Sequence, residues 1–331
     1  KLRMAVFDWP MIQCGKQLVH PIHYNKERLP NLKEVEIKPP WDIVYLEQEI
    51  KSWEVQINKQ GDIICFSKDR SGLQKLDHTT GKLQPYCLSS FDGKTECSQF
   101  DKITGLAVDE DDTLYVLSGD ENDGYELSVY TGDGKNTHHC TLEFLNGKKF
   151  SNIEINVNED KNIVFGLMEF GGTIKVYLCN TNGKQINSIN TGLKGDEYMI
   201  KFVTGFCNKQ IVLLTRKLLG RPKLNELYVY TEDGDLEKTF KFQPSEGDDN
   251  YRRLFYSHVT KNIIGFVWDM HNVKILIEQL SGQTGELQHS YSLYNTNSPT
   301  NEIYFRLFRH PSGTLALVCG SHLILLEKPS Q

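Results

Sequence analysis

The chain has 331 residues, of which 39% are hydrophobic, 11% aromatic and 24% charged. Its formal net charge of −6 excludes a protein that binds nucleic acid over its whole surface, because neutralising phosphates requires Lys and Arg in excess. No run approaches the roughly 18 consecutive apolar residues of a membrane-spanning helix, so we expect no contact with a membrane core.

Residues 1–30 precede any repeating pattern, and we expect them to form an N-terminal extension that packs on the remaining domain. His20 and His23 lie close together, but two histidines without a third ligand at a suitable spacing give only a weak metal signal. The next segment, 32–37, alternates apolar and charged residues, which predicts a β-strand.

One strand pattern then recurs through the chain with a period of about 50 residues, which is typical of propellers and solenoids. Each copy contains a short apolar run that we interpret as the second strand of a four-stranded unit. A glycine that closes a later turn keeps the same spacing, at Gly81, Gly134, Gly183, Gly234 and Gly285. The six apolar runs lie at residues 63–66, 114–117, 163–166, 211–214, 263–266 and 315–318.

Each repeat holds about four short strands and no convincing helix, so the sequence predicts an all-β, six-bladed β-propeller with four-stranded blades. Residues 31–331 form a single domain in this interpretation. The last repeat ends after its third strand, so we expect residues 32–38 to complete the last blade. This closure would join the two ends of the chain and remove exposed sheet edges.

The eight cysteines show no CxxC pair and no recurring position. We interpret them as unpaired core residues in a reducing compartment. Cys87–Cys97 is the best disulfide candidate if that interpretation is wrong. No Asn-x-Ser/Thr glycosylation site is present. Together these features favour a cytoplasmic location and leave secretion open as the alternative.

In propellers, the loops between strands two and three and the connections between blades emerge on one face. Near the start of each innermost strand the sequence has one large aromatic residue, which could stack on a ligand or pack between blades. We take all six as candidate binding residues, with interblade packing as the structural alternative. They are Trp53, Phe100, Phe150, Tyr198, Tyr251 and Tyr304.

A basic group is expected on the same face, formed by the loop between strands two and three of blade four and by arginines that begin blades five and six. Such a group would steer an acidic or phosphate-bearing partner to this face despite the net negative charge. Its residues are Arg216, Lys217, Arg221, Lys223, Arg252, Arg253 and Arg306.

Metal binding and catalysis have weaker signals. The acidic loop 119–124 has the wrong spacing for an EF-hand, and residues 109–112 are expected to form only a turn on the opposite face. The candidates for a metal-dependent hydrolase are Glu54, Asn152 and Glu154, but Lys201 and Arg253 occupy comparable positions in other blades. No nucleophile and base pattern recurs. We therefore expect no cofactor, no metal and no enzymatic activity.

The pattern Gly105–Asp109, followed by a β run at 113–116 and by Val129 and Tyr130 before Asp133, resembles the NHL repeat. NHL repeats form a six-bladed propeller at the C-terminus of many tripartite-motif proteins. The resemblance implies a non-enzymatic domain, here a monomeric one, that binds RNA or protein through one face. The net acidity places a protein partner ahead of RNA. A propeller lectin or toxin that binds carbohydrate, and a metal-dependent hydrolase, are the alternative classes.

Overall fold

The structure is a computed structural model that describes residues 12–14, 17–23, 43–45, 55–67, 69–89, 95–96, 100, 102–205, 209–219, 224–245, 251, 253–257, 261–269, 274–295, 305–310, 315–319 and 322–327. Within these residues the chain is almost entirely β-strand, with one short 3-10 helix, η1 (Glu143–Leu145). None of the helices in this described part has the length and apolar character that crossing a membrane requires.

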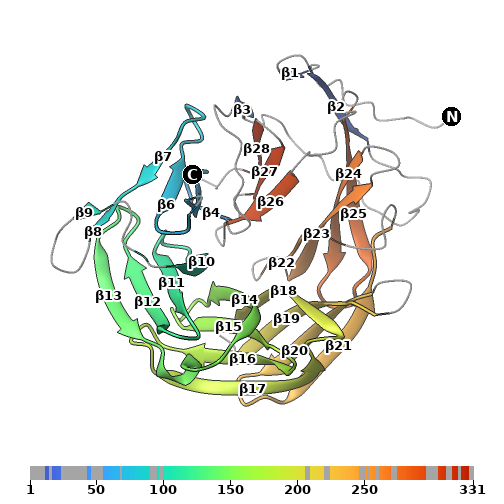
Figure 1. Cartoon of the computed structure of the whole chain (residues 1–331). Coiled ribbons are helices and arrows are strands. Elements are labelled where there is room, and N and C mark those ends of the chain that lie inside the picture. The colour runs from blue at the N-terminus through green and yellow to red at the C-terminus, as the bar shows by residue number, and fades with distance from the viewer. Residues whose placement is uncertain are drawn as a thin grey trace.

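Five antiparallel four-stranded sheets form the blades of a propeller (Figure 1). Blade 1 contains β4 (Val55–Ile57), β5 (Ile63–Phe66), β6 (Leu73–Leu76) and β7 (Leu83–Tyr86). Blade 2 contains β10 (Ile103–Val108), β11 (Leu114–Asp120), β12 (Gly124–Tyr130) and β13 (Asn136–Thr141). Blade 3 contains β14 (Phe150–Val157), β15 (Ile163–Glu169), β16 (Thr173–Cys179) and β17 (Gln185–Lys194). Blade 4 contains β18 (Tyr198–Gly205), β19 (Gln210–Lys217), β20 (Asn225–Thr231) and β21 (Leu236–Phe242). The closing blade contains β26 (Phe305–Arg309), β27 (Leu315–Cys319), β28 (His322–Glu327) and β3 (Ile43–Tyr45).

Between blade 4 and the closing blade lies a six-stranded sheet. Its inner strands are β22 (Arg253–Ser257), β23 (Asn262–Asp269), β24 (Lys274–Ser281) and β25 (Leu287–Asn295). Its outer edge is extended by β2 (Gln17–His23), which pairs with β25, and then by β1 (Ile12–Cys14). A separate two-stranded sheet, β8 (Leu88–Ser89) with β9 (Thr95–Glu96), follows blade 1.

The prediction of six four-stranded blades is therefore correct for five sheets and wrong in its count. The period of the sequence is right, because every predicted second strand is the second strand of its own sheet. The difference arises from the N-terminal residues, which add strands to an edge that the repeat pattern leaves uncovered. Pairing of this kind depends on tertiary position and leaves no periodic signal in the sequence.

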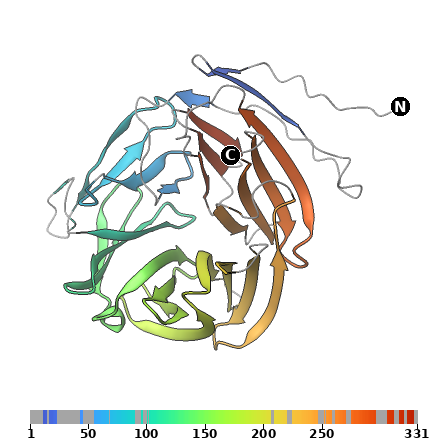
Figure 2. The ribbon, with the colours of Figure 1, turned by 45° about the vertical axis from the view of Figure 1, so that its right-hand side comes forward.

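The innermost strands contact one another in a complete circuit, in the order β4, β10, β14, β18, β22, β26 and back to β4. Figures 1 and 2 show the sheets arranged radially around this circuit, with the outermost strands such as β13 and β17 at the circumference. We call the centre of the circuit the axis.

An N-terminal strand completes the last sheet, as expected, but it is not the predicted one. β3 pairs antiparallel with β28, with Val44 opposite Leu323. The predicted closing segment, residues 32–38, lies outside the described residues. Alternation of apolar and charged residues identifies a segment that could be a strand. Which N-terminal segment pairs with β28 depends on which one lies beside that edge of the closing blade in the folded chain.

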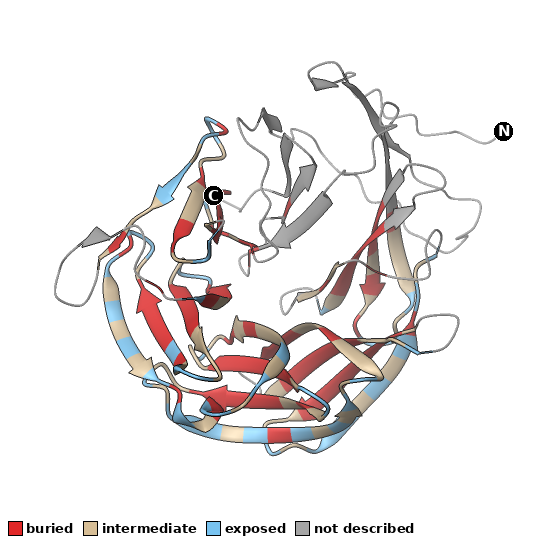
Figure 3. Ribbon diagram, in the orientation of Figure 1, coloured by how far each residue is buried: buried red, intermediate tan, exposed pale blue. Residues whose placement is uncertain are grey.

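The hydrophobic core is divided among the interfaces between neighbouring sheets. One cluster joins blades 2 and 3 and includes Leu127 and Phe165, and another joins blades 3 and 4 and includes Val176 and Leu213. Figure 3 shows buried residues along the middle strands, whereas the outermost strands alternate between exposed and partly buried residues. The middle strands therefore bury side chains against neighbouring sheets, as expected for packed sheets.

The propeller has two distinct faces. Backbone hydrogen bonds join the loops between strands two and three to the connections between blades, for example from Phe170 N–H to the Lys149 carbonyl at 3.0 Å and from Leu218 N–H to the Glu197 carbonyl at 2.7 Å. We call this side the loop face. The other side carries the tight turns between strands one and two and between strands three and four, and we call it the turn face.

The turn between the first and second strands has the same backbone in five sheets. The residue two positions before each of the apolar runs that begin at 63, 114, 163, 211 and 263 has a positive φ, at Gly61, Asp112, Lys161, Lys209 and Lys261. Non-glycine residues adopt this conformation at some cost. The recurrence shows that the turn geometry, rather than the residue type, is the conserved element of the repeat within this chain.

Candidate functional site

The predicted aromatic ring is mostly part of the core. Tyr251 is fully buried and Phe100 is 9% exposed, whereas Phe150 and Tyr198 are partly buried against the interblade clusters. The Phe100 ring packs edge-on against Tyr130, and Phe150 packs against Tyr125 with 5.6 Å between ring centroids. The remaining two predicted members, Trp53 and Tyr304, lie outside the described residues.

Tyr251 shows why a propeller needs such a residue. A Cβ atom added at Gly265 would lie 2.2 Å from the Tyr251 ring, so the ring occupies the space above a residue that has no side chain. The Tyr251 hydroxyl donates a hydrogen bond to the buried carboxylate of Glu278. The position therefore contributes packing between blade 4 and the six-stranded sheet.

The predicted basic loop begins at the end of β19. Arg216 and Lys217 are partly buried there, and the Lys217 ammonium lies 5.9 Å from the centroid of the Tyr198 ring. Leu219 follows them and is 58% exposed. Arg221, Lys223 and Arg252 lie outside the described residues. Arg253 is the first residue of β22 and Arg306 is the second residue of β26, and both strands are innermost.

Sequence reasoning missed Phe170, which is the most exposed large hydrophobic residue in the described part of the chain. It occupies the turn between β15 and β16 and is 72% exposed, with the Lys149 ammonium 5.9 Å from its ring centroid. Its turn is equivalent to the loop that carries Leu219 in the next blade. Aligning the repeats on their second strands would have placed these two loops at equivalent positions, and their large apolar residues could then have been recognised as a pair.

Blade 4 buries polar side chains that have no hydrogen-bond partner where β19 and β20 meet the loop that carries Leu219. The Thr215 hydroxyl and both polar atoms of the Asn225 amide have none, and both residues are fully buried. Thr215 lies opposite Glu226 across the β19–β20 pair. Buried polar atoms are nearly always satisfied, so this end of blade 4 is destabilised relative to the rest of the core.

Three charged residues lie at one level of consecutive innermost strands. Glu154 lies opposite Gly166 and Arg253 lies opposite Phe266, in each case the fourth residue of the predicted second strand. Lys201 is the extra residue of a β-bulge between Ile200 and Phe202, which pair with Thr215 and Leu214. The three side chains therefore occupy one level of three consecutive innermost strands.

Glu154 interacts electrostatically with the other two residues. Loss of hydration raises the pKa of Glu154, and the positive charges of Arg253 and Lys201 act against this increase. All three side chains are partly exposed, so solvent reaches this level of the axis. Asn152 lies two residues before Glu154 in β14, nearer the loop face, and its side-chain amide donates a hydrogen bond of 3.2 Å to the Ile200 carbonyl of the next blade.

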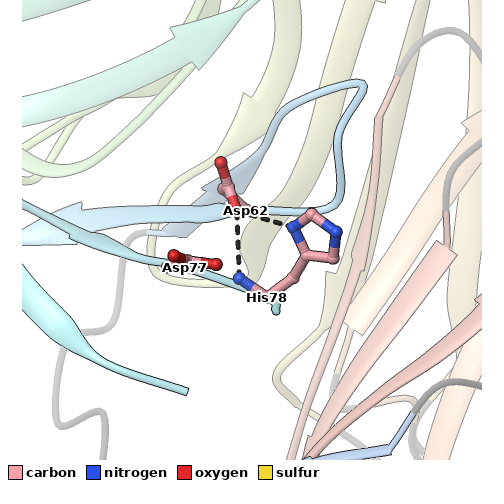
Figure 4. A group of neighbouring side chains, drawn as sticks. All are labelled: Asp62, Asp77 and His78. Carbon is pink, nitrogen blue, oxygen red and sulfur yellow. Dashed lines mark hydrogen bonds and ion pairs between the residues drawn. The ribbon is translucent and has the colours of Figure 1, made fainter. Parts of the chain in front are cut away.

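One group of side chains has a geometry that could suggest a metal site. Asp62, Asp77 and His78 lie together on the turn face of blade 1 (Figure 4). Asp62 is already paired, with the Lys75 ammonium at 2.7 Å and His78 Nδ1 at 2.7 Å from its two oxygens. Burial alone would raise the pKa of Asp62, but the hydrogen bonds from Lys75 and His78 outweigh it and lower the pKa below 3.8. A lysine in contact with the central carboxylate favours a structural role over metal binding.

The acidic loop 119–124 is similarly neutralised. Asp120 accepts a hydrogen bond from the Asn122 N–H at 2.8 Å, and the Lys102 ammonium lies 3.6 Å away. Glu121 is paired with Lys149 at 3.1 Å. The lysines and the backbone N–H group therefore neutralise and hold the acidic side chains of this loop.

The predicted turn 109–112 has a larger role than expected. Asp112 accepts a hydrogen bond of 2.8 Å from the Lys59 N–H of blade 1, and His310 Nε2 of the closing blade lies 3.0 Å from the same carboxylate. Asp109 is buried, and the Lys161 ammonium of blade 3 lies 2.7 Å from it. These two carboxylates therefore connect four of the blades on the turn face.

The cysteines are of two kinds. Cys65, Cys140 and Cys179 are free thiols, and burial raises the pKa of Cys179 to about 12. Cys87 is disulfide-bonded, so the expectation that all cysteines are unpaired is wrong for this residue. Its predicted partner, Cys97, lies outside the described residues.

No protein-family model and no curated protein sequence matches the chain. Similar solved structures include polysaccharide lyase Uly1, at 11% identity and a TM-score of 0.47 over 82% of this chain and 76% of that chain. The β-propeller domain of Nup133 from Vanderwaltozyma polyspora is 10% identical, with a TM-score of 0.41 over 88% of this chain and 83% of that chain. The PQQ-bound aldose sugar dehydrogenase from Streptomyces coelicolor is 13% identical, with a TM-score of 0.47 over 87% of this chain and 98% of that chain. These distant similarities carry no argument about function, and the β-propeller fold follows from the sheets and the circuit of innermost strands in this chain.

Proposed function

We propose that the chain is a recognition propeller without catalytic activity, which binds a protein partner on its loop face at blades 3 and 4. If the six-stranded sheet is counted as a blade, the propeller has the six-bladed organisation of NHL-repeat domains, and the proposed role is the one that the NHL resemblance implies.

The observation that supports this proposal is the pair of exposed apolar side chains at neighbouring loop tips. Four large hydrophobic residues are strongly exposed in the described part of the chain, and two of them, Phe170 and Leu219, occupy equivalent loops of adjacent blades on one face. Exposed apolar side chains that gather on one face mark interaction surfaces, whereas scattered ones need no explanation. We call this pair and its surroundings the Phe170–Leu219 surface.

The charges around the pair define the chemistry of the partner. Lys149 lies beside the ring of Phe170, and Arg216 and Lys217 precede Leu219. Arg221 and Lys223 add positive charge to the same loop in the sequence. The partner that fits is a protein segment that carries apolar side chains flanked by carboxylates, because apolar anchors supply affinity and complementary charges supply steering.

The test is affinity capture with the intact chain, comparing two double variants. Phe170→Ser with Leu219→Ser should abolish capture of the partner. Ile186→Ser with Leu236→Ser is the matched control, because both residues are 50% exposed at the beginnings of outer strands β17 and β21. Equal capture by the two variants would refute the proposed surface.

RNA binding is the second candidate, and it is favoured by the basic residues of the blade 4 loop. A filter-binding assay with single-stranded RNA separates it from the protein-binding proposal.

Carbohydrate binding through the aromatic ring has less support, because Phe100 and Tyr251 are buried. A metal-dependent hydrolase is disfavoured by the cations beside Glu154.

The expected cytoplasmic location also remains a proposal. The disulfide at Cys87 favours the alternative, which is secretion into an oxidising compartment.

A further inference from the structure

The turn between the third and fourth strands of blade 4 has the chemistry of the partner that fits the Phe170–Leu219 surface. Leu236 begins β21 directly after this turn and is 50% exposed. Residues 232–237 have the sequence Glu-Asp-Gly-Asp-Leu-Glu, so four carboxylates flank the leucine. We call residues 232–237 the Leu236 turn.

The backbone of the Leu236 turn is fixed by its own hydrogen bonds. The Thr231 N–H donates a hydrogen bond of 2.9 Å to the Asp235 carbonyl, and the Gly234 N–H donates one of 3.0 Å to the Thr231 carbonyl. Asp233 and Asp235 are exposed, and within the part of the chain that the structure describes neither carboxylate has an ion pair or a side-chain hydrogen bond. A preorganised turn with unpaired charges loses little entropy and few existing contacts when it binds.

The corresponding turn of blade 3 provides a comparison. Ile186, near the start of β17, is also 50% exposed, but residues 181–187 contain one lysine and no carboxylate. Apolar exposure therefore does not distinguish the two turns, whereas charge does. Only the Leu236 turn of this pair matches a basic surface.

The Phe170–Leu219 surface carries the opposite charge. Residues 216–223, which include Leu219, contain four cations and no carboxylate. The Lys217 ammonium lies 5.9 Å from the centroid of the Tyr198 ring and has no ion pair among the described residues. Lys149 lies beside Phe170 but is already paired with Glu121 at 3.1 Å. Lys217 and the loop that follows it therefore supply the charge that is available to a partner.

The two complementary surfaces lie on opposite faces of the propeller. The Leu236 turn joins β20 to β21 and so belongs to the turn face, whereas Phe170 and Leu219 lie on the loop face. Two rigid copies therefore cannot make both contacts with each other, as a two-fold dimer would require. A contact between unlike surfaces leaves one of each exposed at the ends of the assembly, so further copies can add.

We propose that a second copy of this chain occupies the Phe170–Leu219 surface through its Leu236 turn, so that copies associate head to tail. Leu236 contacts the two apolar side chains, and the carboxylates of Asp233 and Asp235 pair with the cations of the Leu219 loop. This inference rests on the proposed function, because it uses the same surface, and it makes self-association a competitor of any other protein partner. Exposed ion pairs contribute little, so the contact is weak and depends on protein concentration.

Sedimentation velocity of the purified full chain over a range of concentrations tests the proposal. The average sedimentation coefficient should rise with concentration beyond that of a dimer. The rise should diminish when the salt concentration increases from about 0.1 M to about 1 M, because the Debye length falls from about 10 Å to about 3 Å. Leu236→Ser should weaken association by about tenfold, as expected for loss of a buried leucine side chain. Ile186→Ser is the matched control and should leave association unchanged.

A mixture of two variants gives the sharpest measurement. The chain with Phe170→Ser and Leu219→Ser keeps the Leu236 turn, and the chain with Leu236→Ser keeps the loop surface. At a concentration where the wild type associates, each variant alone should remain monomeric, whereas an equimolar mixture should form a one-to-one complex and nothing larger. That complex would also show that both variants are folded. A monomeric wild type, or association that either variant retains alone, would overturn the inference.

Failure of the proposed function gives a different result. If the wild type is monomeric but the variant with Phe170→Ser and Leu219→Ser loses capture of another protein, only the self-association is wrong. If that variant captures the other protein as well as the wild type does, the recognition surface itself is wrong.

Discussion

The turn face and the loop face of this propeller use their polar residues in opposite ways. On the turn face, the buried carboxylates of Asp62 and Asp109 and the partly buried carboxylate of Asp112 are paired with lysine, histidine and backbone N–H groups, several of them from other blades. On the loop face, Phe170 and Leu219 extend into solvent. One face therefore holds the ring together, and the other presents exposed apolar side chains.

The largest effect is expected where the turn face connects blades that are not neighbours. Asp112→Asn keeps the shape of the side chain and tolerates the φ of +64° at this position, but it removes the charge facing His310. Replacing the carboxylate that faces a fully buried histidine should lower the free energy of unfolding by about 3 kcal/mol. Urea denaturation measures it, with the exposed neighbour Asp111→Asn as control. Equal effects of the two substitutions would remove the distinction between the faces.

The aromatic residues at the loop-face ends of the innermost strands belong to the core in this comparison. Gly265→Ala would place a methyl group 2.2 Å from the Tyr251 ring and should destabilise the fold by about 2 kcal/mol. Thermal unfolding measures the loss. In a Tyr251→Ala background the same substitution should cost much less, and an undiminished cost would show that the ring is not what occupies the space.

Acid should weaken the turn face selectively. Burial would raise the pKa values of Asp62 and Asp112, but hydrogen bonds to their carboxylates lower both below the usual 3.8. Their contribution to stability is therefore present above pH 3.8 and is lost as the pH falls through the lower folded-state values. Asp62→Asn should cost about 1.5 kcal/mol at neutral pH and reduce the pH dependence of urea unfolding below pH 4. An unchanged pH profile would contradict this assignment.

The polar side chains buried at the root of the blade 4 loop should respond in the opposite direction. Asn225→Leu replaces an amide that has no hydrogen-bond partner with an apolar group of similar volume. We expect the protein to become more stable by about 1 kcal/mol. Val229→Ala serves as the control. Val229 lies on the same face of β20 and belongs to the core cluster between blade 4 and the six-stranded sheet, so this substitution should destabilise the protein. A destabilised Asn225→Leu variant would show that the amide is satisfied in solution.

The smallest effect is expected at the loop face itself. The double substitution of Phe170 and Leu219 by Ser should change the free energy of unfolding by no more than about 0.5 kcal/mol, because neither side chain contributes to the core. Differential scanning calorimetry measures this. A larger loss would mean that the two side chains support the fold, and the proposed surface would lose its basis.

The sequence by itself determined the strand period, the identity of every second strand and the presence of a closing N-terminal strand. These features follow from local alternation and turn chemistry, which repeat in each unit. The tertiary structure decided which N-terminal segment pairs with β28, how many strands extend β25, and that Tyr251 is buried whereas Phe170 is exposed. It also brought Asp112 to His310 and Asp109 to Lys161, because contacts between separate blades depend on how the ring closes and leave no local pattern in the chain.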